Sequence, residues 1–205
     1  TPQRVFLEVQ IAGWAPARVK VFQTTFDSAG LTSGTTGTLS QAVVGCTADA
    51  ECTPAIPAGY GPGATCTFGG AGKCQGGVNR GLQCFSDGDC PGSTCARSCE
   101  NAFINTADPR FILAGTVAIA AVNTSVPNTA FGATIISGAP VTDPGTIRYG
   151  GTFVVDVPAG AVGTFTIKVH PDSNGTFLGD EFDALIPLTF LPDATIVVKC
   201  TANAN

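Results

Sequence analysis

Hydrophobic and polar residues alternate near the start of the chain. One face of an extended segment there carries four aliphatic residues, Val5, Leu7, Val9 and Ile11. Glu8 and Gln10 lie on the other face, and this period of two is typical of a half-buried β-strand. A second alternating segment covers residues 18–26, after a break at 13–16. The simplest prediction is that these two segments form an antiparallel pair.

The second half of the chain predicts further strands separated by turn-forming residues. The predicted strands are 111–122, 131–137, 147–157, 163–170, 186–191 and 194–200. With the first two segments they make about eight or nine short strands, and no long helical period is present. This spacing predicts an all-β fold of the jelly-roll β-sandwich type.

The composition changes between residues 45 and 100. This segment holds eight of the nine cysteines, namely Cys46, Cys52, Cys66, Cys74, Cys84, Cys90, Cys95 and Cys99. Its few large aliphatic and Phe side chains cannot offset chain entropy, so disulfides must stabilise it. A zinc site is disfavoured because no C-x-x-C pair occurs and the single histidine, His170, is distant. We predict a sandwich in two parts, 1–44 and 101–205, with a disulfide-rich insertion at 45–100.

The insertion repeats a short motif. Residues 46–52 and 84–90 share the pattern Cys-x-x-acid-x-acid-Cys, followed soon after by Pro54 and Pro91. Each copy precedes two further cysteines, which predicts two successive four-cysteine units. The pattern resembles Cys-rich repeats with Asp-x-Asp-Cys-Pro-Gly cores in secreted bacterial surface proteins, a resemblance that implies an extracellular module.

Cys200 is the odd cysteine, because the eight others can pair among themselves. An odd cysteine in a secreted chain suggests an intermolecular bond or a free thiol. The alternative is a Cys200–Cys99 disulfide, which would leave a different cysteine of the insertion unpaired. Spacing alone does not decide the connectivity.

Two stretches of the predicted sandwich resemble a known family. They are Val-Phe-Leu-Glu-Val-Gln-Ile-Ala-Gly-Trp at 5–14 with Val-Lys-Val-Phe-Gln at 19–23, and residues 151–160 with 163–169. Together they look like a cohesin-like jelly-roll sandwich of bacterial extracellular proteins, over about 150 residues. The resemblance implies non-catalytic binding of a dockerin-type partner or of neighbours in a surface assembly. The insertion departs from the family pattern.

Charged residues make up only 12% of the chain, with 15 acids and 10 bases. A neutral surface associates easily because little repulsion separates the copies, although a monomer coated in Thr and Ser would have the same composition. No basic run is present, which excludes nucleic acid as a partner. No apolar stretch is long enough for a membrane helix. The cysteines, the start at Thr1 and the absence of Met fit a secreted product of signal-peptide cleavage, although removal of an initiator Met would look the same.

Few residues suggest chemistry. His170 follows a predicted strand, which is a loop position rather than that of a catalytic base. A calcium site is conceivable at Asp172, Asn174, Asp180 and Asp183, but a solvated hairpin loop explains these residues better. Asn123 and Asn174 begin N-glycosylation sequons. Three scattered aromatics, Trp14, Tyr60 and Tyr149, do not make a sugar-binding platform, and Trp14 is expected to plug the end of the sandwich.

The sequence therefore predicts a secreted, non-catalytic structural subunit of an extracellular filament, sheath or surface layer. Copies of the chain are the expected partners, joined through edge strands or through the terminal segments 1–11 and 194–205. The alternative is a cohesin-like adhesion module that binds a dockerin-type protein or a polysaccharide. Neither function requires a cofactor, apart from the calcium considered above.

Overall fold

The structure is a computed structural model that describes residues 3–27, 40–54, 59–66, 72–81, 83–123, 128–170, 175–190 and 194–199. The chain is nearly all β, which confirms the predicted fold class. Its described helices are the 3-10 turns η1 (Asp49–Glu51) and η2 (Asp87–Asp89). Within these residues, no helix has the length and apolar character needed to cross a membrane.

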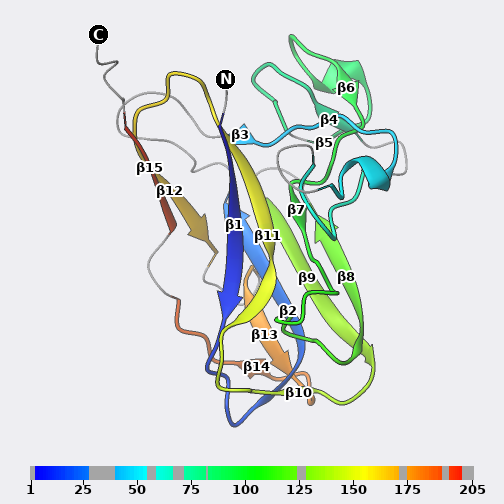
Figure 1. The fold of residues 1–205 in the computed structure, drawn as a ribbon, viewed down its shortest axis with the longest axis vertical. Coiled ribbons are helices and arrows are strands. Elements are labelled where there is room, and N and C mark those ends of the chain that lie inside the picture. Colours follow the sequence, from blue (N-terminus) through cyan, green and yellow to red (C-terminus); the bar gives the residue numbers. More distant parts are fainter. Residues whose placement is uncertain are drawn as a thin grey trace.

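One sheet is built around β11 (Arg148–Val157). The strand β1 (Gln3–Ile11) pairs with one side of β11 along its full length. Two short strands, β3 (Ser40–Gln41) and β7 (Ala102–Phe103), pair with the other side. β3 precedes the Cys-rich segment and β7 follows it. Because both strands pair with β11, the segment begins and ends beside the same strand of the sheet (Figure 1).

The second sheet is built around β2 (Arg18–Asp27). One side of β2 pairs with β9 (Asn128–Ser137), which pairs in turn with β8 (Val117–Asn123). The other side is shared by β13 (Phe177–Asp180), followed by β14 (Leu185–Ile186), and by β12 (Gly163–Val169), followed by β15 (Ala194–Val198). The short strand β10 (Val141–Thr142) pairs with the start of β2. β8 and β15 therefore lie at opposite edges of this sheet.

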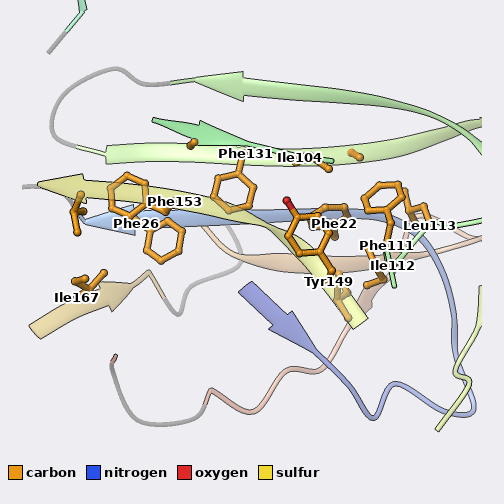
Figure 2. Packing of buried hydrophobic residues seen from close by; sticks show 14 of the residues in the cluster. Phe22, Phe26, Ile104, Phe111, Ile112, Leu113, Phe131, Tyr149, Phe153 and Ile167 are labelled. Atoms are coloured by element: carbon orange, nitrogen blue, oxygen red, sulfur yellow. The ribbon is translucent and has the colours of Figure 1, made fainter. Parts of the chain in front are cut away.

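The main hydrophobic core lies between the two sheets. Phe26 of β2 stacks on Phe153 of β11, with ring centroids 4.7 Å apart, and Phe131 of β9 packs beside them (Figure 2). The predicted alternation of the first strand is confirmed, since four of its residues pack against this core, namely Val5, Leu7, Val9 and Ile11. Burial of both sheets against one core is the arrangement of a β-sandwich.

The predicted pairing of the first two strands is wrong. β1 pairs with β11 and β2 pairs with β9, so the two strands lie in different sheets. The connection between them contains Trp14, which is buried and donates its indole N–H to the carbonyl of Val141. Each strand has one apolar face, and placing the strands in opposite sheets buries both faces against the same core.

Two predicted strands also differ from the structure, and one strand of the structure is not predicted. Residues 111–113 are buried, but Phe111 forms only an isolated bridge with Tyr149 and residues 112–113 lie in a turn, so the strand begins only at Val117. Gly115, with a φ of 84°, turns the backbone between them. Of the described residues 186–190 only Ile186 lies in a strand, as the second residue of β14, whereas the unpredicted β13 pairs with the centre of β2. A four-residue strand has too little alternation to be recognised in sequence.

The Cys-rich segment forms four disulfides. The pairs are Cys46–Cys66, Cys52–Cys99, Cys74–Cys90 and Cys84–Cys95. The prediction of two successive units is therefore wrong, because Cys99 belongs with the first motif and Cys74 with the second. The inner unit (Cys74, Cys84, Cys90, Cys95) is inserted into the outer unit (Cys46, Cys52, Cys66, Cys99). The Cys200–Cys99 alternative is likewise excluded, since Cys99 bonds to Cys52.

The outer unit packs on the outer face of the β1–β11 sheet. Tyr60 and its cysteines form a second small core with Val154 of β11 and Phe6 of β1. The Phe6 and Tyr60 rings pack edge to face, with their centroids 6.0 Å apart. This apolar contact supplements the disulfides, so cross-links alone do not stabilise the insertion.

Candidate assembly edges and the disulfide module

The repeated motif folds into the same turn twice. The first acid of each copy accepts a hydrogen bond from the backbone N–H of a later cysteine: Asp49 from Cys66 and Asp87 from Cys95, both at 2.7 Å. In each case that cysteine also bonds to the first cysteine of the motif. The acid at this position therefore holds the partner cysteine in place.

The second acid of each motif closes the turn itself. Glu51 accepts hydrogen bonds from the hydroxyl and N–H of Thr47, which lower the pKa of Glu51. Asp89 accepts from the N–H groups of Phe85 and Ser86, and these bonds lower the pKa of Asp89. Hydrogen bonds to an ionised carboxylate favour its charged form. The acidic positions that define the motif are thus structural.

Each unit has its own central strand, and the two strands differ in their position relative to the motif. In the inner unit β4 (Gly72–Cys74) lies between β5 (Gln83–Cys84) and β6 (Cys95–Ala96). In the outer unit the central segment is 97–100, which bonds to residues 44–46 on one side and to Thr65 on the other. β4 precedes its motif in sequence, whereas 97–100 follows its own. Because the central strand precedes the motif in one unit and follows it in the other, the inner unit fits between the motif and the central strand of the outer unit. This order explains why one pair of disulfides lies within the other in sequence.

A buried carboxylate joins the inner unit to the sandwich. Asp156 of β11, with a side chain only 4% exposed, forms ion pairs with Arg4 of β1 at 3.0 Å and with Arg80 of the inner unit at 2.8 Å. The guanidinium of Arg4 also lies 5.3 Å from the centre of the Tyr60 ring. Burial raises the pKa of Tyr60. These contacts fix the module against β1 and β11.

In the loop considered as a calcium site, the described carboxylates at residues 180–183 take part in turns and ion pairs. Asp180 accepts hydrogen bonds from the N–H groups of Phe182 and Ala184, both at 2.8 Å. Asp183 pairs with Lys20 at 2.8 Å, and Glu181 pairs with Arg18. The other two proposed calcium ligands, Asp172 and Asn174, lie outside the described residues, so calcium binding stays a prediction.

The other predicted sites are placed as follows. His170 directly follows β12, where its backbone N–H donates to the carbonyl of Thr25. Asn123 is the last residue of β8, whereas Asn174 and Cys200 lie outside the described residues. Three aromatics considered for sugar stacking, Trp14, Tyr60 and Tyr149, are each buried at 3% exposure, which excludes them as an exposed platform.

Among the described residues, the groups of potential metal ligands that lie close together are cysteines already bonded in disulfides. Disulfide sulfurs are not thiolate ligands. Four disulfides instead indicate an oxidising environment of the kind found outside the cell.

Two strands at opposite edges of the larger sheet, β8 and β15, carry no charge. β8 reads Val-Ala-Ile-Ala-Ala-Val-Asn, and β15 reads Ala-Thr-Ile-Val-Val. Ile119 of β8 is 56% exposed and Val197 of β15 is 58% exposed. Within the described chain, neither strand has a partner on its outer side. Figure 1 shows β8 at one side of the sheet, below the Cys-rich module, and β15 at the opposite side.

The edge of the smaller sheet differs in character. β1 carries Arg4, which pairs with Asp156, and Glu8, which forms a two-pronged ion pair with Arg110. Charged side chains on an edge strand discourage pairing with another chain. The edges suited to strand addition are therefore β8 and β15, which sequence alone could not single out because it does not give the strand order.

Comparison with known proteins gives no relative. No family model, no curated protein and no solved structure matches the chain.

Proposed function

We propose that this protein is a non-catalytic, secreted structural subunit that assembles into an extracellular filament, sheath or surface layer. The observation that carries the proposal is the pair of uncharged, exposed edges at opposite ends of one sheet. An edge strand offers unpaired N–H and C=O groups to another chain, and natural monomers usually block it with charges, proline or a cover. Neither β8 nor β15 contains a charge or a proline.

The position of the two edges favours an open assembly. β8 of one copy would pair with β15 of the next, which continues the sheet β8-β9-β2-β12-β15 across the boundary. Such a contact joins two different surfaces, and head-to-tail contacts that do not close into a ring produce filaments. The low charge of the chain adds little repulsion between neighbours.

The cohesin-like alternative uses a sheet face instead of an edge. The outer unit covers the face of β1 and β11 that bears Phe6 and Val154, so a dockerin-type protein or polysaccharide would have to bind elsewhere. The outer face of the β8–β9 side would remain for it. This alternative expects a stable monomer with a saturable ligand.

Electron microscopy of negatively stained protein tests the proposal. We expect filaments or sheets from the unaltered chain and none from Ile119→Lys or Val197→Lys, because a lysine on an edge strand opposes pairing. The matched control is Ile147→Lys, since Ile147 is 59% exposed but precedes β11 instead of lying on a sheet edge. Ile147→Lys should assemble normally.

Two outcomes would reject this account. Dispersed monomers of the unaltered chain at high concentration would favour the binding module. Equal loss of assembly in all three variants would mean that general surface apolarity, and not strand pairing, drives association.

A further inference from the structure

A lysine, an asparagine and a glutamate meet at the boundary between the two disulfide units. Nζ of Lys73, in β4, lies 2.9 Å from Oδ1 of Asn101 and 3.3 Å from Oε2 of Glu100. Because a C=O bond measures about 1.2 Å, the carboxamide carbon of Asn101 lies no more than about 4 Å from Nζ. The amine is therefore close to the distance at which nucleophiles attack carbonyl groups.

The reacting lysine and asparagine are closed to solvent. Lys73 and Asn101 are both 0% exposed, and the Glu100 side chain is 19% exposed. Burial lowers the pKa of Lys73, while Glu100 opposes that change. A buried lysine with a lowered pKa more readily becomes the neutral amine, which is the nucleophilic form.

We propose that Lys73 and Asn101 form an intramolecular isopeptide bond, with Glu100 transferring the protons. Glu100 accepts a proton from Nζ, and the neutral amine attacks Cγ of Asn101. The Nζ–Cγ bond forms and the Cγ–Nδ2 bond breaks, while the carboxyl group passes protons from Nζ to the departing nitrogen. The lysine ammonium and the carboxamide become a secondary amide and an ammonium ion, with no oxidant or cofactor.

The bond would join parts that the disulfides leave separate. Each disulfide of the described chain lies within one unit, and none connects the inner unit to the outer unit. Lys73 is next to Cys74 of the inner unit, and Asn101 directly precedes β7, where the chain re-enters the sandwich. The amide would tie the inner unit covalently to the sandwich. This inference does not depend on the proposed assembly.

The mass of the fully reduced and denatured chain tests the inference. We expect a mass lower than that of the sequence by one ammonia molecule, and a branched peptide containing Lys73 and Asn101 after proteolysis. Lys73→Arg, Asn101→Ala and Glu100→Gln should each restore the full sequence mass. The control Lys20→Arg, which alters a half-buried lysine paired with the exposed Asp183, should keep the loss.

The unaltered chain decides the question even if a variant fails to fold. A mass equal to that of the sequence would overturn the inference and leave Lys73 as a buried ion-pair and hydrogen-bond donor. An ammonia loss that persists in Lys73→Arg would also overturn it, because the loss would then come from elsewhere, such as succinimide formation at Asn174-Gly175.

Discussion

At the scale of single residues, Asp156 connects the module and the sandwich. It is buried and faces Arg4 and Arg80, each about 30% exposed or less. Asp156→Asn would leave two guanidinium groups facing each other without the countercharge. We expect the free energy of unfolding to fall by about 3 kcal/mol in urea titrations, as for the loss of one partner from a buried ion pair.

The control for this prediction is an exposed pair. Asp183, 80% exposed, pairs with Lys20 and has a φ of 61°, a conformation that asparagine also tolerates. Asp183→Asn should therefore cost less than about 1 kcal/mol. Similar losses in the two variants would show that Asp156 acts no differently from a surface charge.

The turn of the inner unit should weaken in acid. The pKa of Asp89 is lowered in the folded state, so the stability that its carboxylate contributes is present at neutral pH. It is lost as pH falls from about 4, the value in the unfolded chain, through the lowered pKa. The thermal midpoints of the unaltered chain and Asp89→Asn should differ at pH 7 and converge in acid. A difference that does not change with pH would contradict this role.

At the scale of elements, the disulfides should differ in their accessibility. Seven of the eight paired cysteines are buried, whereas Cys95 is half-buried. A reductant reaches an exposed sulfur first. Brief treatment with a dilute reductant, followed by alkylation and peptide mapping, should label Cys84 and Cys95 before the other cysteines. Earlier labelling of Cys52 and Cys99 would contradict the packing of the outer unit.

Several elements could be predicted from sequence because their signals are local. The alternation in β1 and the β-rich runs of β2, β9, β11 and β12 depend on side chains a few positions apart. The residues 111–113 show the limit of this reasoning. They are apolar because they enter the core, and burial occurs in turns as well as in strands. The short strand β13 was missed because β2 and not its own sequence stabilises it.

The partners of these elements could not be predicted. Whether β1 pairs with β2 or β11 depends on contacts more than 150 residues apart in sequence, as shown by the pairing of Gln3 with Val157. The disulfide pairs could not be predicted for the same reason, because they too depend on contacts between distant residues. The repeated spacing suggests two successive units, whereas in the structure the inner unit is inserted into the outer unit. The cluster of Lys73, Glu100 and Asn101 gives no local signal, since its members come together only through the central strands of the two units.

At the scale of the whole molecule, two different edge strands of one sheet, β8 and β15, are proposed to join the copies. The sequence indicated an uncharged surface suited to self-association, and the strand order shows which uncharged strands lie at the ends. The terminal segments 1–11 and 194–205 are the connectors expected from the sequence, and that role stays a prediction. β15 lies in the second segment and at a sheet edge, whereas β1 pairs with β11 along its length and carries charges on its edge.

The most direct test mixes two variants that cannot assemble alone. Ile119→Lys blocks β8 but retains β15, and Val197→Lys blocks β15 but retains β8. If β8 of one copy pairs with β15 of the next, each variant alone is a monomer and an equal mixture forms dimers and nothing larger. Size-exclusion chromatography with light scattering measures this directly. A mixture that stays monomeric, or a single variant that still forms filaments, would contradict head-to-tail pairing of these strands.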